Sequence, residues 1–520
     1  MPSNETQVLI VGAGPTGLAL AVWLARFGVQ LRIVDKTAEV APVSRALGVH
    51  ARTLEFYRQL GFADHAVARG VVMESLNLWA RDKRVASVSI ADIGEGLTPF
   101  PFVLDLAQDD HERLLIEQLS AAGITVERQT ELTGVTQNGD VVIATLRHAD
   151  GRTEECRAPY VAGCDGTHST TRSALGVAFA GGTYEHLFYV ADVIARGPAV
   201  DHGVNVGLDE ADLLAVFDMK GKGRVRLVGT VRDDAAEKAQ FTFDDVARRP
   251  LERLRVQVEQ VNWFSTYRVH HRVANRFRVG RVFLLGDAAH VHSPVGAQGM
   301  NTGIGDAVNL AWKLAAVIDG ESPASLLDTY EPERIAFARR LVATTDRVFV
   351  IASKSGGFAG FARTRVFPAL VSLGFRSRAA QRYLFRTVSQ IMINYRGRAL
   401  SVGQAGSVHG GDRLPWVPLA EGSDNYTPLT SVRWQVHVYG NASPELRSVC
   451  DELGLELHVF GWIETMGRAG LVRNALYLLR PDSYIALAAT SRHEASLRDY
   501  ALRHGLALAK PRPVPQGVHQ

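Results

Sequence analysis

Two glycine-rich stretches have residue types and spacings suited to binding a phosphorylated cofactor. The first contains Gly12, Gly14 and Gly17 in the pattern G-x-G-x-x-G, and Asp35 follows at the end of the next apolar run. In this pattern the first glycine permits a tight turn, the second lets the backbone approach a pyrophosphate, and the third lets a helix pack closely on a strand. The pyrophosphate lies at the helix N-terminus, and an acid placed like Asp35 accepts a hydrogen bond from a ribose hydroxyl. This stretch predicts adenine-dinucleotide binding and does not distinguish FAD from NAD.

The second stretch, LLGDAAHVHSPVGAQGMNTG over residues 284–303, distinguishes the two cofactors. Asp287 at the end of an apolar run can hold a hydroxyl of the flavin side chain. Gly296, Gly299 and Gly303 allow backbone N–H groups to approach a planar ring, and a helix that begins there stabilises the anion of reduced flavin. Alone, the stretch also fits an ordinary turn in which Asp287 caps a helix. Its occurrence together with the first stretch favours FAD.

The elements that must position these residues are alternating strands and helices. The apolar run 8–11 is typical of a parallel strand buried on both faces, 18–27 predicts a helix, and 31–34 predicts a second strand. The segment RAPYVAGCDGTHSTTRSALG again predicts strand, turn and helix, and residues 281–318 predict a third such unit. We therefore expect an α/β fold with a Rossmann-like domain of the glutathione-reductase type.

The rest of the chain predicts two further domains. Alternating apolar and polar residues between 177 and 267 indicate antiparallel strands, helical Arg-rich patterns occupy about 325–400, and a new α/β-like segment occupies about 425–508. The predicted division is a discontinuous FAD-binding domain over 1–176 and 268–400, an inserted substrate-binding sheet domain over 177–267 with contributions from about 72–105, and a C-terminal domain over 401–520.

Composition excludes several classes of protein. The 520 residues are 46% hydrophobic and 21% charged with a formal charge of +3, as in an ordinary globular protein. We expect Lys and Arg to be interleaved with Asp and Glu, which leaves no basic face for nucleic acid. Three cysteines are too few for a disulfide framework and favour the cytoplasm. The apolar run 8–25 lacks the basic flank of a signal peptide and is broken by glycines and a proline, so no membrane span is expected.

The motifs resemble the single-component FAD-dependent aromatic hydroxylases, a family similar to para-hydroxybenzoate hydroxylase, in particular the branch of phenol, pentachlorophenol and polyketide hydroxylases. Three motifs carry the resemblance, over about residues 6–350. They are Gly12-Ala13-Gly14-Pro15-Thr16-Gly17, the segment GCDGTHSTTR with Asp165, Gly166, Ser169 and Arg172, and the second glycine-rich stretch with Gly286, Asp287, Pro294, Gly299, Met300 and Asn301.

Further segments extend the resemblance. SRALGVHARTLE resembles the family segment that places Arg45 near FAD, LDLAQDDHERLL resembles the segment whose glutamine, here Gln108, reaches FAD, and Lys36 follows the ribose-binding Asp35. LYLLRPDSYIALAA, residues 476–489, resembles the thioredoxin-like C-terminal domain of phenol and polyketide hydroxylases. It has no C-x-x-C, so packing or dimer contact is its expected role instead of thiol chemistry.

The resemblance implies an NAD(P)H-dependent monooxygenase with non-covalent FAD. NAD(P)H, bound transiently, would reduce FAD. O2 would then form a flavin C4a-hydroperoxide, which hydroxylates a phenolic or aromatic small molecule in a chamber that excludes water. Pro294, Gly299 and Asn301 would position flavin and oxygen. Family habit suggests a homodimer.

Several alternatives stay open at this point. Baeyer–Villiger oxidation or epoxidation of a polycyclic or polyketide substrate would use the same cofactor, and a non-catalytic dinucleotide-binding protein would use the same fold. No general base is assigned, because Tyr189, Tyr267 and His270 also fit packing roles. His290 and His292 lack further ligands at metal-binding spacing, so no metal is expected.

Overall fold

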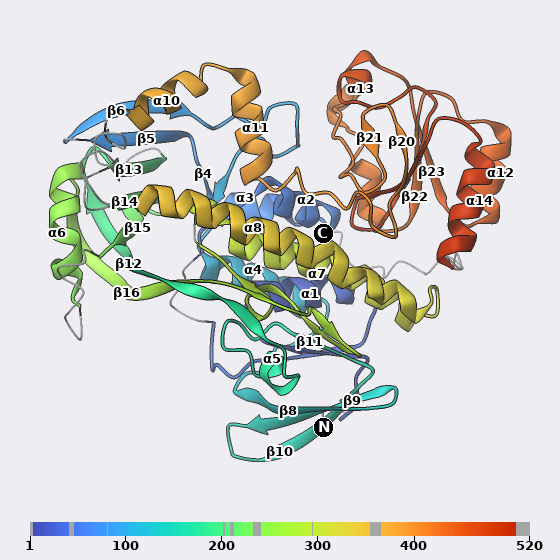
Figure 1. Ribbon diagram of the computed structural model, residues 1–520, viewed down its shortest axis with the longest axis horizontal. Coiled ribbons are helices and arrows are strands. Elements are labelled where there is room, and N and C mark those ends of the chain that lie inside the picture. Colours follow the sequence, from blue (N-terminus) through green and yellow to red (C-terminus); the bar gives the residue numbers. More distant parts are fainter. Residues whose placement is uncertain are drawn as a thin grey trace. The chain divides into compact units, whose positions relative to one another are not determined.

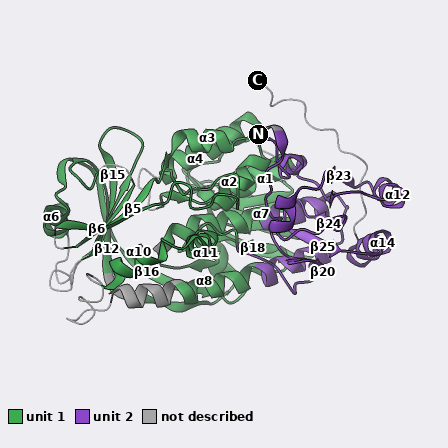
Figure 2. Ribbon diagram, turned by 90° about the horizontal axis from the view of Figure 1, so that it is seen from above, with its two compact units in different colours: residues 1–26, 30–308, 334–391 green, residues 27–29, 309–333, 392–520 purple. Residues whose placement is uncertain are grey.

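The computed structural model describes residues 4–40, 46–80, 82–200, 203–208, 213–231, 241–293, 295–353, 364 and 366–505. The chain divides into two compact units (Figure 2). The first unit comprises residues 1–26, 30–308 and 334–391, and the second comprises residues 27–29, 309–333 and 392–520.

A five-stranded sheet forms the base of the first unit. Its strand order is β17 (Arg278–Val279), β18 (Val282–Leu284), β11 (Tyr160–Gly163), β1 (Val8–Val11) and β2 (Leu31–Val34). The last four strands are parallel, and β1 and β11 are buried along their whole length, as the continuous apolar runs predict.

Helices and two small sheets surround this base. The helices are α1 (Pro15–Arg26), α2 (Ala51–Gln59), α3 (Ala63–Arg69), α4 (Gln108–Ala121), α5 (Thr170–Ala174) and α7 (Gln298–Ile318). Helix α1 packs against α4, and its residues from Gly17 to Leu24 are all buried because both sides of the helix meet protein. The small sheets are β3 (Gly48–Val49), β7 (Leu104–Asp105) and β4 (Val71–Val72), and the antiparallel β8 (Thr130–Asn138), β9 (Val141–His148) and β10 (Thr153–Ala158).

An eight-stranded sheet forms the other end of the first unit (Figure 1). Its order is β19 (His290–Val291), β16 (Gln257–Ala274), β12 (Phe179–Arg196), β15 (Arg224–Thr230), β14 (Leu213–Asp218), β13 (Val204–Leu208), β5 (Ser75–Ala80) and β6 (Lys83–Ser89). All neighbours are antiparallel except β13 and β5. Helix α6 (Phe243–Leu254) packs on one face through a core that includes Leu214, Leu227 and Leu254.

Among the described residues up to 391, three further α-helices follow α7 in the chain. They are α8 (Tyr330–Ser353), which begins in the second unit, α10 (Phe367–Gly374) and α11 (Arg378–Val388). Helix α10 packs against β6 at the edge of the eight-stranded sheet.

The second unit contains a six-stranded mixed sheet. Its order is β21 (Val408–His409), β20 (Val402–Ala405), β25 (Ile485–Ala489), β24 (Leu476–Leu479), β22 (Gln435–Tyr439) and β23 (Glu456–Phe460), and its helices are α12 (Pro444–Glu452), α13 (Glu464–Arg468) and α14 (His493–His504). Apolar clusters on both faces of β22 and β24 bury the sheet.

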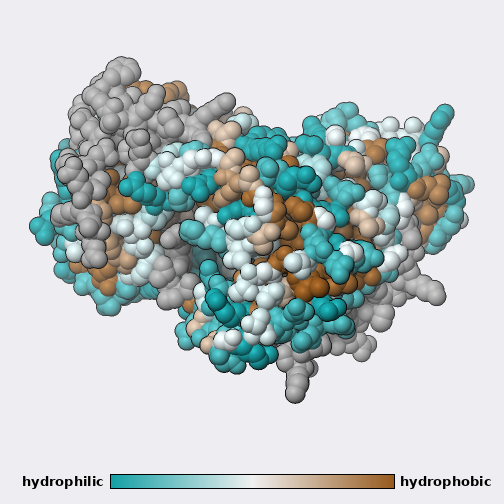
Figure 3. All heavy atoms as spheres, turned by 60° about the horizontal axis from the view of Figure 1, so that its bottom comes forward, coloured by the Kyte–Doolittle hydropathy of each residue, from teal (hydrophilic) through white to brown (hydrophobic). Residues whose placement is uncertain are grey.

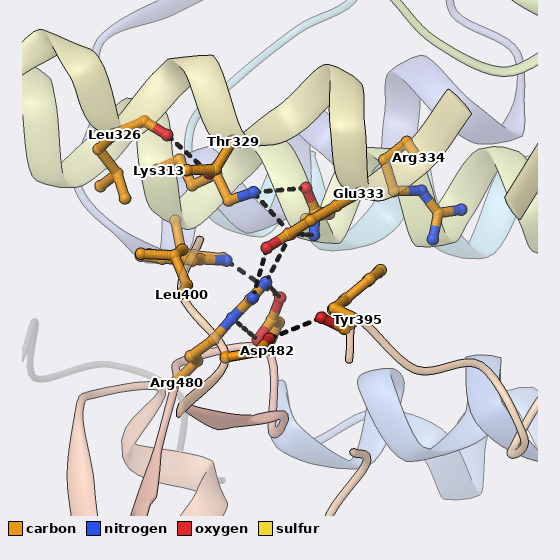
Figure 4. A network of polar contacts seen from close by, with 12 residues as sticks. Lys313, Leu326, Thr329, Glu333, Arg334, Tyr395, Leu400, Arg480 and Asp482 are labelled. Atoms are coloured by element: carbon orange, nitrogen blue, oxygen red, sulfur yellow. Dashed lines mark hydrogen bonds and ion pairs between the residues drawn. The ribbon is translucent and has the colours of Figure 1, made fainter. Parts of the chain in front are cut away.

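A buried charge network joins three segments of the second unit (Figure 4). Glu333 accepts hydrogen bonds from Lys313 at 2.8 Å and from both terminal nitrogens of Arg480 at 2.8 and 3.1 Å. Arg480 also donates to Asp482 at 2.6 Å. Burial opposes ionisation of Glu333, but Arg480 and Lys313 lower its pKa to about 2. The network therefore ties α7 and the start of α8 to the end of β24.

The molecular surface is mixed in character. Hydrophilic side chains cover much of the face seen in Figure 3, with hydrophobic patches among them. Among the described residues, no helix is both long enough and apolar enough to span a membrane.

Candidate active site

The three sequence motifs meet at one edge of the parallel sheet. Because β1, β2, β11 and β18 are parallel, their carboxyl ends lie together. Gly12 follows β1, Asp35 follows β2, Asp165 follows β11, and Gly286 and Asp287 follow β18. This edge is where nucleotide cofactors bind in open α/β sheets.

The first motif has two glycines that packing requires and one that leaves space. Gly12 has a φ of +101°, and a Cβ on it would lie 2.4 Å from the carbonyl oxygen of Cys164. A Cβ on Gly17 would lie 2.0 Å from the carbonyl oxygen of Gly12. A Cβ on Gly14 would meet no atom within 4 Å. The backbone at Gly14 is therefore open to an approaching group, as a pyrophosphate-binding turn requires.

Thr16 joins the first motif to the second glycine-rich stretch. A Cβ on Gly286 would lie 2.5 Å from the Thr16 hydroxyl oxygen, and one on Gly303 would lie 2.2 Å from it. Pro15 begins α1 directly before it. The start of α1 and the first turns of α7 can come this close only because both facing residues are glycines.

Asp35 lies half-buried beside the first motif. Its Oδ2 accepts a hydrogen bond from the Ala13 backbone N–H at 2.6 Å, and its Oδ1 accepts from the Thr37 backbone N–H at 2.8 Å. The neighbouring Lys36 is exposed. The acid therefore stands at the glycine turn, where the sequence places a ribose contact.

Asp165 organises the second motif from within. Its carboxylate accepts from the Ser169 hydroxyl at 2.5 Å and from the Thr171 backbone N–H at 2.9 Å, while Ser169 caps α5. Arg172 donates to the carbonyl oxygens of Thr167 at 2.8 Å and Ala288 at 3.0 Å. The second motif is thus a hydrogen-bonded turn fastened to the second glycine-rich stretch.

Asn301 is fully engaged by protein atoms. Its Oδ1 accepts from the His50 backbone N–H at 2.9 Å and the Thr53 hydroxyl at 2.7 Å, and its Nδ2 donates to the carbonyl oxygens of Gly48 and Ala297 at 2.9 Å each. With these four bonds its amide has no capacity left for a ligand. Asn301 fixes the turn before α7, where Gly296 and Ala297 both have positive φ.

The other residues that the sequence predicts at the cofactor site differ in their contacts and exposure. Gln108 accepts from the Ala46 backbone N–H at 3.3 Å and donates to Glu112 at 2.8 Å. Met300 places its sulfur 3.3 Å from His111, and Gly299 is half-buried in the first turn of α7. Asp287 is exposed between buried neighbours. Arg45 and Pro294 lie outside the described residues.

The histidines of the second stretch have separate partners. His290 contacts Asp306 at 2.7 Å, and Asp306 also accepts from Arg334 at 2.6 Å and from the Gly286 backbone N–H at 3.0 Å. Burial opposes ionisation of Asp306, yet Arg334 and His290 lower its pKa. The described part of the chain has no group of three or more potential ligands that could hold a metal ion.

The candidate bases from the sequence are packed residues. Tyr189 is buried beside Phe264, Tyr267 packs against Phe188, and His270 contacts the Thr183 hydroxyl at 2.7 Å.

Sequence reasoning missed a buried carboxyl, that of Asp105. Among the described residues its Oδ1 is buried without a hydrogen-bond partner. Burial raises its pKa well above the ordinary value, Asp218 raises it further, and Arg226 opposes the shift. Arg226 donates to Ala46 at 2.9 Å and forms a bidentate pair with Asp192. A strongly perturbed carboxyl with specific charged neighbours is a functional-site candidate.

Asp105 lies where three parts of the site converge. It precedes Gln108 on the same segment and pairs with Gly48 across β3 and β7, and a Cβ on Gly48 would lie 2.9 Å from Ala297 before α7. Its charged neighbours belong to the eight-stranded sheet. The signal that could have found it is an isolated acid inside an apolar strand, VLDLA.

This arrangement defines a dinucleotide-binding α/β protein, and comparisons with known proteins specify the family. A family model described as an FAD binding domain matches residues 5–345. The chain is 32% identical over 503 residues to a flavin-dependent monooxygenase of Mycobacteroides abscessus, which covers 93% of this chain and 97% of that protein. It is 37% identical over 413 residues to the 6-methylpretetramide 4-monooxygenase of Streptomyces rimosus, covering 78% and 72%.

A solved structure supports the same assignment. The OxyS anhydrotetracycline hydroxylase from Streptomyces rimosus superposes with a TM-score of 0.77 at 28% identity, covering 97% of this chain and 99% of that chain. The chain belongs to the FAD-dependent monooxygenase family. The expected mixed α/β fold and FAD are confirmed.

Proposed function

We propose that this protein is an NAD(P)H-dependent hydroxylase of phenolic aromatic compounds. The observation that carries the proposal is the convergence of all three motifs on one sheet edge, with the backbone open at Gly14 and closely packed at Gly12, Gly17, Gly286 and Gly303. The open position fits a bound dinucleotide, and the packed positions fit a site built in advance for it.

The residues proposed to hold FAD follow from this geometry and the family resemblance. They are Gly12, Gly14, Pro15, Thr16, Gly17, Asp35, Lys36, Arg45, Gln108, Asp165, Gly286, Asp287, Pro294, Gly299, Met300 and Asn301. The engaged side chains of Asp165 and Asn301 support an indirect role for both, in which each fixes a turn whose backbone faces the cofactor. Pro294, Gly299 and Asn301 keep the proposed positioning role.

FAD, when bound and reduced by NAD(P)H, supplies the activation of O2. The chain's own residues would orient the cofactor and the substrate and would exclude water from them. The N-terminus of α7, aimed by the turn at Gly296 and Ala297, would stabilise negative charge on the reduced ring. Apolar residues beside Asp105, namely Leu47, Ala107, Phe217 and Met219, would keep water from the reacting centre.

Asp105 is the residue proposed to hold an oxygen of the substrate. Burial raises the pKa of Asp105 and so favours its protonated form, in which the carboxyl can donate a hydrogen bond to a phenolate or carbonyl oxygen. An apolar site with one well-placed polar group is the usual design for a small aromatic ligand.

A polycyclic phenol is the proposed substrate class. The support is that one similar protein is named a 6-methylpretetramide 4-monooxygenase and another an anhydrotetracycline hydroxylase. The test is NADPH and NADH oxidation by the FAD-loaded protein, with and without mono- and polycyclic phenols, with products read by mass. Substrate-stimulated oxidation with a product heavier by one oxygen supports hydroxylation. A ring-expanded lactone as product would indicate Baeyer–Villiger oxidation instead of hydroxylation, and an epoxide would indicate epoxidation. No oxidation with any compound, despite bound FAD, would favour a non-catalytic role.

The role of Asp105 has its own test with the phenol that stimulates oxidation most. Asp105→Asn keeps a neutral donor of the same shape, so we expect its KM within about threefold of the parent value. Asp105→Leu removes the donor, and loss of one hydrogen bond of about 1–2 kcal/mol should raise KM about tenfold. Equal KM values for the two variants, at unchanged FAD content, would contradict the assignment.

The architecture around the site is also part of the proposal. We propose that residues 1–176 and 268–400 act as the FAD-binding domain, and that 177–267 with part of 72–105 acts as the substrate-binding domain. Residues 401–520 would form a thioredoxin-like domain without C-x-x-C, with a packing or homodimer role. Analytical ultracentrifugation of the FAD-loaded chain tests the dimer.

A further inference from the structure

Charge is segregated along the chain, contrary to the expectation of interleaving. The chain has 57 Lys and Arg against 54 Asp and Glu; ten of the former and none of the latter lie in residues 347–411, which leaves 47 against 54 elsewhere. The ten are Arg347, Lys354, Arg363, Arg365, Arg376, Arg378, Arg382, Arg386, Arg396 and Arg398. In sequence this segment carries only basic charges and the rest of the chain has a net negative charge, while in the structure Glu95 lies 3.8 Å from Arg378 and Asp412 pairs with Arg396.

The same segment exposes large apolar side chains. Twelve large hydrophobic residues of the described chain are exposed, and six of them lie on or next to α10 and α11. Leu370 and Leu373 are 60% and 61% exposed, and Tyr383 is 66% exposed. We call the following residues of the first unit the α10–α11 surface: Val366, Phe367, Leu370, Leu373, Arg376, Arg378, Arg382, Tyr383, Leu384 and Arg386.

Other side chains of the two helices anchor them in the protein. Val371 of α10 packs against the apolar cluster of Leu78, Ala86 and Leu208 in the eight-stranded sheet. Phe385 of α11 is buried, and a Cβ on Gly94 would lie 2.3 Å from its ring. Phe367, Leu370 and Leu373 recur every three residues and so share one side of α10. Both helices are therefore packed on the first unit, and these apolar side chains are exposed on them.

We propose that the α10–α11 surface docks onto an anionic lipid surface. A basic amphipathic face with large aliphatic and aromatic side chains lies in the interface of a bilayer, where arginines meet anionic headgroups and apolar side chains enter the acyl boundary. Both the arginines and the apolar side chains therefore find favourable contacts in this one environment. Neither helix spans the bilayer, so the docking is peripheral.

Two other partners use only part of this chemistry. Nucleic acid would pair with the arginines but would leave Leu370, Leu373 and Leu384 in water. A second copy docked symmetrically would cover the leucines but would bring like-charged arginines of both copies together. The charge and the apolar area favour the same partner only when that partner is an anionic lipid layer.

The test is co-sedimentation of the full FAD-loaded chain with large vesicles. Vesicles of phosphatidylcholine alone are compared with vesicles containing about one third phosphatidylglycerol, at low and at high salt. We expect binding to the anionic vesicles only, and we expect high salt to weaken it. Arg376→Gln with Arg382→Gln should weaken binding about fivefold per arginine, and Leu370→Ser with Leu373→Ser should weaken it about tenfold or more.

A matched control separates this surface from general charge and hydrophobicity. Leu502→Ser with Arg503→Gln alters a leucine that is still more exposed, together with an exposed arginine, on α14 and should leave binding unchanged. Absence of parent binding, equal binding to both vesicle types, or equal loss in the control would overturn the proposal. A change of oligomeric mass in the α10–α11 variants would overturn it in favour of a second copy. Melting temperature and FAD content of each variant report folding, and neither depends on the proposed hydroxylation.

Discussion

Glu112 offers a quantitative test of the region beneath the proposed FAD site. Its side chain is 5% exposed, and its carboxylate accepts a hydrogen bond from Gln108 at 2.8 Å. Burial raises its pKa from 4.5 to about 7; Gln108 and Arg128 oppose the rise, while Asp35 adds to it. A carboxyl in this state is partly neutral at physiological pH. Replacement by glutamine, Glu112→Gln, preserves the acceptor and removes the ionisation.

The magnitude follows from the two pKa values. A raised folded-state pKa means that ionisation destabilises the folded protein. The penalty is absent below about pH 4.5, grows between about 4.5 and 7, and is constant above. At about 1.4 kcal/mol per pKa unit, the full penalty is about 3 kcal/mol. Glu112→Gln should therefore stabilise the protein by about 1 kcal/mol at pH 5.5 and about 3 kcal/mol at pH 8.5.

Urea unfolding of the FAD-loaded parent and variant at the two pH values measures this difference. Glu117→Gln, on the same helix but at the surface, serves as the control, and its effect should stay within about 1 kcal/mol. If Glu112→Gln gave the same stability change at both pH values, burial would not be holding this carboxyl neutral, and the reasoning would fail.

Four further substitutions test the packing described above. Gly17→Ala should prevent FAD retention, because the new Cβ would lie 2.0 Å from a carbonyl oxygen. Gly14→Ala should fold normally and lower only the affinity for FAD, because its Cβ would meet no protein atom within 4 Å. The absorbance of bound flavin reports FAD retention, and the melting temperature reports folding. Asn301→Ala removes four buried hydrogen bonds and should cost about 2–4 kcal/mol in free energy of unfolding, and a loss under about 1 kcal/mol would contradict its role. Lys313→Met leaves Glu333 with one fewer buried partner and should cost about 3–5 kcal/mol by the same measurement; a neutral result would show that Arg480 and Asn309 suffice.

The elements around the glycine motifs could be predicted from sequence because their signals are local. The strands at residues 8–11 and 31–34 form as expected, since continuous apolar runs of this length suit a sheet buried on both faces. The first helix begins at Pro15 and ends at Arg26, close to the prediction. Helix α7 begins at Gln298, earlier than its apolar pattern, because Asn301 and the positive φ of Ala297 fix the turn before it.

The chemistry of individual side chains was harder to predict because it depends on distant residues. Burial raises the pKa of Asp105, Asp218 raises it further and Arg226 opposes the rise. Asp218 and Arg226 come from strands far along the chain. The side chain of Asn301 makes its hydrogen bonds to residues between 48 and 53 and to its own turn, and the motif alone could not predict these partners. The proposed cofactor set stays a prediction, and Arg45 and Pro294 fall outside the described residues.

The two long strands of the eight-stranded sheet begin and end side by side. Phe179, where β12 starts, pairs with Ala274, where β16 ends, so the chain leaves the cofactor-binding sheet and returns to it at neighbouring positions. An intervening segment with adjacent ends can lengthen, shorten or be exchanged without displacing the strands that carry the glycine motifs. In evolutionary terms, the two parts can change at different rates, because the glycine motifs are held by close packing at Gly12, Gly17, Gly286 and Gly303, whereas the segment between them leaves and rejoins the sheet at adjacent positions.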